Sequence, residues 1–417
     1  MLAVDTIDPR FDENPTLPGV SDPWPVYRAV RETDPVHWCA GAHLWAVMRY
    51  DDAQTVLKDS RLSRQAYLDS LETRTGRQPI IEMQRHELVF MDNPHHGQLR
   101  QLIGDAINAQ AVRDLRSEID TLVEQKLAPL LSRGHFDAIG DFLLTLPTAI
   151  AAAWLGVPEE EREQITSWIF PLVSGRGVTR DPQTTAAASA AAKQLRAYFN
   201  ALIRQRRAAP KGDLISALLA TQAQAPSLMS DDDLFALFAA VFAAGHTPGI
   251  ALLAGTLLAL LEFPDQLARL RADLSLLPLA IEEGLRYNSP TQAPNPLAAL
   301  EDISIRGKTI HKGEALTAIL ASANRDPEVF PEPDRFDVGR TPNRHLAFSA
   351  GAHYCLGAML TRLEAHSILS AVVQRLPGLR LACNPGELTW IPHDRFRMLA
   401  TLPIAFETIS QSPAPVP

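Results

Sequence analysis

A single cysteine in a glycine-containing stretch near the carboxyl end of the sequence has the clearest potential for chemistry. Residues 348–357 read FSAGAHYCLG, which places Cys355 between Gly351 and Gly357, two residues after His353. Glycines allow the backbone to turn tightly and to approach a flat group closely. A helical pattern follows the cysteine, and the N-terminus of that helix would direct amide donors at the sulfur and lower the pKa of the thiol. Such a thiolate is one of the axial ligands that proteins offer to haem iron.

This stretch resembles the haem-binding signature of the cytochrome P450 family, F-x-x-G-x-H-x-C-x-G. The matching residues are Phe348, Gly351, His353, Cys355 and Gly357. Ser349 stands where many members of the family have glycine. A lone cysteine is more commonly a buried and inert residue, which is the alternative interpretation. The resemblance implies instead that Cys355 is the axial ligand of haem b and that the other matching residues contact this cofactor.

A second stretch, MDNPHHGQLRQLI at residues 91–103, resembles the D-x-P-x-H-x-x-x-R pattern of the same family. His96 and Arg100 are four residues apart and therefore share one face of a helix. Alone, such a pair is typical of a solvated basic face, but the resemblance implies that it binds the haem propionates, which need such partners when buried. His345 matches a propionate-binding histidine of the family, whereas Leu297 stands where the family usually has a propionate-binding arginine.

The most apolar segment, residues 234–261, predicts a long buried helix. Its centre resembles the oxygen-binding segment of the family, commonly A-G-x-[DE]-T-[ST]. The corresponding residues are Ala244, Gly245, His246, Thr247 and Pro248. The small residues leave room for oxygen and substrate, but Thr247 and Pro248 replace the usual acid and alcohol. Proline has no hydroxyl or N–H, and it frees the carbonyl of Ala244. His246 and Thr247 are candidates for a proton relay, and a core histidine is the alternative for His246.

A third motif, E-x-x-R, places Glu283 three residues before Arg286, and Arg335 follows downstream in the segment PDRF. Residues three apart on a helix can pair, although an ordinary surface pair would look the same in the sequence. Together these residues resemble the Glu–Arg–Arg network of cytochromes P450. The resemblance implies a structural carboxylate, Glu283, shared by the guanidinium groups of Arg286 and Arg335.

Length and composition fit a large globular protein, because a chain of this length can form about two or three average domains or one large enzyme domain. The 417 residues are 46% hydrophobic, enough for a large core, and we expect one catalytic domain over residues 1–417 with flexible tails at about 1–20 and 409–417. The net charge of −9 argues against nucleic-acid binding. No segment reads as a signal peptide or membrane span, and three scattered cysteines indicate a reduced compartment, so we expect a cytoplasmic protein without a membrane partner.

The resemblance extends over roughly residues 23–403 and implies the cytochrome P450 fold, mainly α with small β-sheets. In that fold, haem b lies between a long distal helix and the helix that follows the cysteine loop. Residues 62–88 lack clean periodicity and are predicted to form a long connection. The predicted pocket segments are residues 62–88, 168–173, 237–245, 291–295 and 392–396.

The family implies activation of O2 with electrons from ferredoxin and ferredoxin reductase, because the chain contains no flavin domain. We expect a monomer that oxidises a small molecule of the secondary-metabolite type, by hydroxylation or by oxidative coupling. One alternative is a peroxide-driven peroxygenase, since such members also carry proline at the position of Pro248, although they have arginine where Thr247 stands here. A non-catalytic haem-binding sensor is the other alternative.

Overall fold

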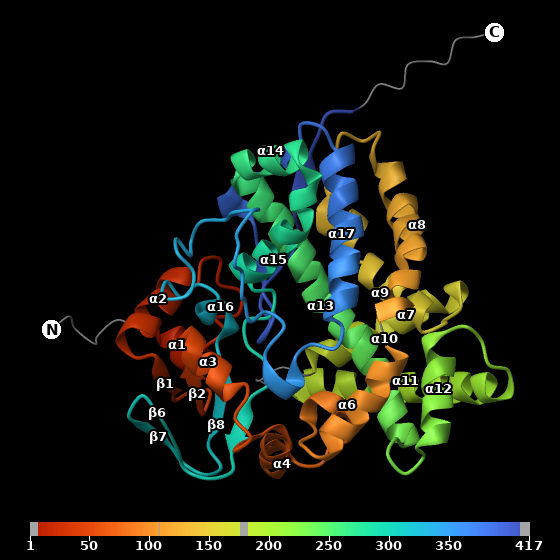
Figure 1. Cartoon of the computed structure of the whole chain (residues 1–417), viewed down its shortest axis with the longest axis vertical. Helices are drawn as coiled ribbons and strands as arrows, with labels where there is room; N and C mark the ends of the chain where they lie inside the picture. The colour runs from red at the N-terminus through yellow and green to blue at the C-terminus, as the bar shows by residue number, and fades with distance from the viewer. Residues whose placement is uncertain (1–6, 108, 176–181, 409–417) are drawn as a thin grey trace, which may run out of the picture.

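The computed structural model describes residues 7–107, 109–175 and 182–408, which form a mainly helical protein with four small sheets (Figure 1). The first helices and the largest sheet lie on one side of the molecule, and most of the longer helices lie on the other. This arrangement confirms the predicted mainly α fold with small β-sheets.

The long helix α13 (Asp231–Glu262) runs through the middle of the helical part (Figure 1). Ser230 caps its N-terminus, and the Ser230 Oγ accepts a hydrogen bond from the Asp233 amide at 3.1 Å. Helix α13 packs against α9 (Leu146–Trp154), α15 (Leu277–Asn288) and α17 (Ala358–Arg375). Among the described residues it is the one helix long and apolar enough to cross a membrane, and 72% of its apolar window is buried inside the fold. A helix that is apolar on all sides and enclosed by others forms the core of a domain.

The segment of residues 348–357, here named the cysteine loop, leads directly into α17. A short 3₁₀ turn, η6 (Gly351–His353), lies within it, and the Cys355 amide donates to the Phe348 carbonyl at 2.9 Å. Because α17 packs on α13, the cysteine loop is held close to the long helix.

The largest sheet has the strand order β1-β2-β8-β5-β3, in which only β2 and β8 are parallel. Its strands are β1 (Val36–Cys39), β2 (Leu44–Val47), β3 (Leu62–Ser63), β5 (Leu297–Ala299) and β8 (Ala315–Ala318). The small hairpin of β10 (Trp390–Ile391) and β11 (Met398–Leu399) presents the turn of residues 392–397 to the interior. The remaining strands are β4 (His135–Asp137), β6 (Ile303–Ile305), β7 (Lys308–Ile310), β9 (Arg380–Leu381) and β12 (Pro403–Ala405).

The other helices surround this framework. They are α1 (Pro9–Glu13), α2 (Trp24–Thr33), α3 (Tyr50–Val56), α4 (Arg64–Thr75), α5 (Pro79–Arg85), α6 (His95–Ala106), α7 (Ala109–Asp114), α8 (Arg116–Leu127), α10 (Arg162–Ser174), α11 (Pro182–Ala208), α12 (Leu214–Gln224), α14 (Pro264–Ala272) and α16 (Leu320–Ala323).

Two predictions about local order are wrong. The segment 62–88 contains the helices α4 and α5 rather than a long loop. Helix α4 is stabilised by a narrow apolar stripe and by an N-terminal cap, in which the Ser63 Oγ accepts a hydrogen bond from the Ala66 amide at 2.8 Å. The predicted flexible tail is ordered from residue 7 onward, where Phe11 and Leu17 are buried. The predicted tail at 409–417 lies outside the described residues.

Candidate active site

A cavity of about 1350 Å³, counted out to its open mouth, lies between α13 and the cysteine loop. Its walls include Ala243, Ala244 and Pro248 of α13 and Phe348, His353 and Cys355 of the cysteine loop. All five predicted pocket segments contribute to it, through residues that include Gln84, Val173, Ala244, Thr291 and Phe396. The cysteine loop, the middle of α13 and the five predicted pocket segments therefore meet around one cavity.

Cys355 lies at the cavity wall just before α17. Gly351 has φ +71°, and a Cβ on it would lie 2.9 Å from the Leu57 carbonyl oxygen, so this turn requires glycine. Gly357 has an ordinary φ of −81°, but its missing side chain leaves open the space beside the sulfur. Burial raises the pKa of the Cys355 thiol, while the Gly357 amide and Arg100 oppose the rise. The predicted lowering of this pKa is wrong, because burial outweighs the helix terminus.

Two histidines with closely packed, tilted rings lie at the cysteine loop. The ring centroids of His96, from α6, and His353 are 4.0 Å apart. Burial, with the charges of Arg100 and Arg64, lowers the pKa of His96 to about 4. Burial also lowers the pKa of His353 to about 2, so both rings are neutral near pH 7. His96 is 1% exposed, and neither of its ring nitrogens has a hydrogen-bond partner among the described residues.

Arg100 extends from the same helix to the cysteine loop, where its Nη2 donates to the Tyr354 carbonyl at 2.6 Å. His345 lies differently from the prediction. Its Nε2 is 3.1 Å from Glu282 Oε2, and its Nδ1 accepts from the Ala347 amide at 3.2 Å. Both ring nitrogens are therefore engaged with protein atoms, and His345 does not line the cavity, so the predicted propionate contact of His345 is wrong.

Two cavity arginines were missed by the sequence reasoning. Arg64 and Arg395 both line the cavity and both donate a hydrogen bond to Asn295. The Arg64 Nη1 donates to the backbone carbonyl of Asn295 at 3.4 Å, and the Arg395 Nη1 donates to the side-chain oxygen of Asn295. Leu297, at the position of the expected arginine, packs instead in a separate apolar cluster with Leu316 of β8. No local motif marks either arginine, and the only signal was the absent cation at position 297.

On α13, Ala244 and Pro248 line the cavity, whereas Gly245, His246 and Thr247 do not. His246 is buried against α9, where its Nδ1 lies 2.8 Å from the Thr148 Oγ1. A helix turns about 100° per residue, so residues 245–247, which lie between Ala244 and Pro248, are directed away from the cavity. The predicted proton relay through His246 and Thr247 is therefore wrong on geometry, and the alternative of a core histidine is correct.

Comparison with known proteins identifies the family. The cytochrome P450 family model matches residues 176–387. The cytochrome P450 monooxygenase PikC of Streptomyces venezuelae is 34% identical over 392 residues, which cover 92% of this chain and 91% of PikC. The chain belongs to the cytochrome P450 family. The crystal structure of CalO2 has a TM-score of 0.88 at 31% identity and covers 98% of this chain and 100% of its own. The cytochrome P450 CxnD, for C–S bond formation in chuangxinmycin biosynthesis, has a TM-score of 0.82 at 31% identity, with 93% and 96% covered.

The cofactor of cytochromes P450 is haem b, and the residues of this P450 fit it. The fit rests on the Cys355 sulfur at the cavity wall, on the unpartnered nitrogens of buried His96, and on the close turn at Gly351. Buried polar atoms in folded proteins are nearly always satisfied, so the His96 nitrogens indicate a polar group supplied by a bound molecule. The P450 is accordingly a haem-dependent oxidoreductase.

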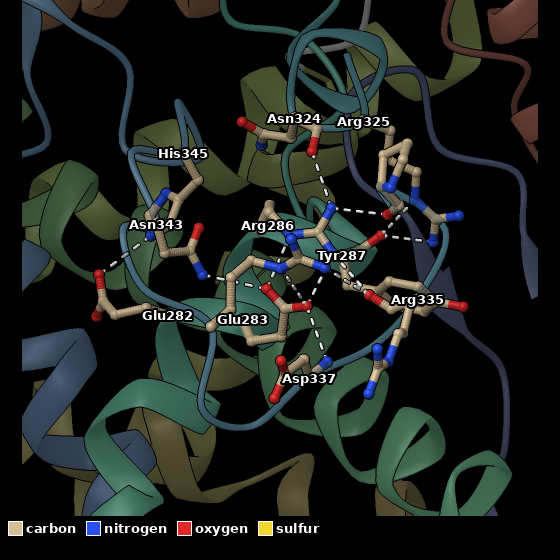
Figure 2. Close-up of polar contacts among 12 residues, drawn as sticks. Glu282, Glu283, Arg286, Tyr287, Asn324, Arg325, Arg335, Asp337, Asn343 and His345 are labelled. Carbon is tan, nitrogen blue, oxygen red and sulfur yellow. Dashed lines mark hydrogen bonds and ion pairs between the residues drawn. The ribbon is translucent and has the colours of Figure 1, made fainter. Parts of the chain in front are cut away.

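The buried carboxylate that supports this side of the P450 is Glu283 (Figure 2). Arg286 pairs with it in bidentate fashion, through Nε and Nη2 at 2.8 Å each, and both side chains are fully buried. The Asp337 amide and the Asn343 side chain donate to it as well, at 3.0 and 3.1 Å. The second guanidinium group is that of Arg340, whose Nε donates to Glu283 Oε1 at 3.0 Å.

The predicted role of Arg335 in this network is wrong. Its side chain is 54% exposed and pairs with Glu332 at 3.2 Å, and no dashed line joins its guanidinium to Glu283 in Figure 2. Only its backbone carbonyl takes part, by accepting from Arg286 Nη2 at 3.1 Å. Sequence spacing could not separate Arg335 from Arg340, since both follow Glu283 at a distance that only the folded loop decides.

Proposed function

We propose that this P450 oxidises a small organic molecule of the secondary-metabolite type, with O2 as oxidant and electrons from a ferredoxin and its reductase. The observation that supports this most strongly is the single cavity onto which Cys355 and the middle of α13 both open. Haem with a thiolate ligand, when bound, activates O2 for oxidation of a substrate. In our proposal Cys355 ligates the iron, and His96, Arg100 and His353 hold the cofactor at its propionates.

The side chains of this P450 shape the reaction through α13. Ala244 is small, which leaves space for oxygen and substrate at the cavity wall. Pro248 provides no hydroxyl, and the carbonyl of Ala244 is free of its helical donor and can hold a water molecule. Because the usual acid and alcohol are absent, we propose that substrate groups and water deliver protons. This arrangement suits either hydroxylation or oxidative coupling, and PikC is named a monooxygenase whereas CxnD forms a C–S bond.

The cavity wall supports a mid-sized substrate with both apolar and polar parts. Its apolar contacts include Phe90, Leu252 and Phe396, and polar groups enter through Gln84 and Thr291. An apolar cavity with few polar groups is the usual form of a small-molecule site.

A ferredoxin partner is supported by the surface outside the cysteine loop. Arg113 and Arg116 are exposed there, and the partly exposed Arg362 of α17 lines the same surface hollow as both of them. Tyr354 and Met359 are exposed large apolar residues of the same region. A local basic patch with an apolar centre suits an acidic electron carrier despite the net charge of −9. The three cysteines are free, which supports our proposal of a cytoplasmic protein.

The test begins with a ligand screen that follows the Soret band of the purified holoenzyme. Ligands that shift it are then turned over with ferredoxin, reductase, NADPH and ¹⁸O2, and products are analysed by mass spectrometry. Hydroxylation predicts one labelled oxygen in the product, and coupling predicts loss of two hydrogens without label. Turnover with peroxide but none with ferredoxin and O2 would contradict the proposal in favour of a peroxygenase. Haem binding without NADPH consumption for every ligand would contradict it in favour of a sensor.

A further inference from the structure

We propose that Arg64 binds a haem propionate and so supplies, from the first turn of α4, the cation that position 297 lacks. This inference concerns the haem cofactor of the family and does not depend on the proposed substrate or electron donor. No motif or comparison assigns Arg64 a role.

The surroundings of Arg64 call for an anion. The residue is 3% exposed, its Nε has no hydrogen-bond partner, and its Nη1 makes a long bond of 3.4 Å to the Asn295 carbonyl. No salt bridge to Arg64 exists within the described parts of the chain, in contrast to buried Arg286, which Glu283 neutralises. The nearby Asp92 attracts the guanidinium but forms no salt bridge with it. A buried cation without a bonded counter-charge costs several kcal/mol, so a bound carboxylate would lower that cost. Burial lowers the pKa of Arg64 to about 10, which leaves it charged at neutral pH.

The position of Arg64 favours a propionate over a substrate carboxylate. Arg64 lines the same cavity as His353 and Cys355. Its charge acts on both His96 and His353, whose rings pack against each other and are themselves the propionate ligands proposed above. An anion held between Arg64 and this histidine pair therefore lies beside the cofactor.

Leu297 stands where the family has a propionate-binding arginine, so another element of the fold must supply that cation. Leu297 faces an apolar cluster of the main sheet, so neither its type nor its direction serves a carboxylate. Arg64 begins α4 directly after strand β3, and β3 pairs with β5, the strand that Leu297 begins. A guanidinium on α4 thus enters the cavity from the strand next to the one where the family carries its arginine.

The experiment compares haem release from the substrate-free holoenzyme of wild type, R64Q and R31Q. Arg31 is a matched control, because it is 5% exposed, has an unpartnered Nε and bonds to Ser322 at 3.0 Å, but does not line the cavity. Haem transfer to excess apomyoglobin is followed by absorbance. We expect R64Q to release haem about tenfold faster than wild type, since a charge-assisted bond to a buried carboxylate is worth at least that factor. The rate of haem release from R31Q should lie within about twofold of the wild-type rate, because Arg31 makes no contact with the cavity and its loss should change the binding energy of haem little.

Resonance Raman spectra of the same proteins provide a readout that is specific for the propionate contact and that a general destabilisation of the fold does not change. The propionate bending band should shift in R64Q and stay unchanged in R31Q. Equal release rates for R64Q and R31Q, or an unshifted band in R64Q, would overturn the proposal. If R64Q does not fold, R64K is measured instead, because lysine keeps the charge but loses the guanidinium donors. A shifted band and a release rate a few-fold above wild type would then support the proposal, and wild-type values for both would overturn it.

Discussion

Replacing Arg340 by alanine should destabilise the protein far more than the same change at Arg335. Arg340 is the second guanidinium on the buried Glu283 carboxylate, and its side chain is 11% exposed. Besides the 3.0 Å bond to Glu283 it donates to three backbone carbonyls, those of Pro331 at 2.8 Å, Glu332 at 3.2 Å and Arg335 at 3.0 Å. The R340A variant therefore removes a counter-charge of Glu283 and the three hydrogen bonds that hold the loop of residues 331–340 together.

The expected loss of stability in R340A depends on the hydrogen bonds that Glu283 keeps. Complete loss of the partner of a buried charge costs about 3–5 kcal/mol. Glu283 keeps its bidentate pair with Arg286 and two neutral donors, so the loss is partial. One charge-assisted bond contributes about 1.5–3 kcal/mol, and we expect the free energy of unfolding to fall by about 2–3 kcal/mol in R340A. Arg335 and Glu332 form an exposed pair, and R335A should change the free energy of unfolding by less than about 0.5 kcal/mol.

The assay is urea unfolding of both variants and wild type, followed by far-ultraviolet circular dichroism and by the Soret band. The R340A midpoint should move to lower urea with both probes, and the R335A midpoint should coincide with wild type. A loss in R335A equal to or larger than that in R340A would refute the assignment of Arg340 to the network.

Three further outcomes are expected. Ser349 has φ +64° and an unpartnered buried hydroxyl, so S349G should raise the free energy of unfolding by up to about 1 kcal/mol, and a lower thermal midpoint would contradict this. Burial raises the pKa of Glu364 from 4.5 to about 8, so the native state holds a proton that the unfolded state releases. Stability should therefore fall in wild type but not in E364Q as pH rises from about 4.5 to 8, and parallel urea midpoints across this window would contradict the account. H246Q should lower stability by about 1 kcal/mol through the Thr148 contact but leave the pH profile of turnover unchanged, and an altered profile would restore a relay role for His246.

The sequence was sufficient where a motif is local. The cysteine loop is short, so its spacing fixes where Cys355, Gly351 and His353 lie relative to one another, and the structure brings them to one cavity. The five pocket segments were also predicted correctly, because the order of the family's elements places them around that space. The position of α13 followed from its largely apolar composition, although the helix begins three residues earlier than predicted, at Asp231.

Longer-range geometry was beyond the sequence. The choice between Arg335 and Arg340 depends on how one loop folds over Glu283, and only the folded loop exposes the first and buries the second. His345 has the right type for a propionate ligand but turns to Glu282. Arg64 reaches the cavity through the pairing of β3 with β5, a contact between segments more than two hundred residues apart that no local pattern records.

Cys355 is assigned here as the thiolate ligand of haem iron, and the ferrous–carbon monoxide spectrum tests this assignment most directly. Wild type should show the red-shifted Soret band of thiolate-ligated haem. C39S and C383S should keep this band, since both cysteines lie outside the cavity wall, and C355S should lose it. A wild-type spectrum without the red shift, or a C355S spectrum that retains it, would contradict the account.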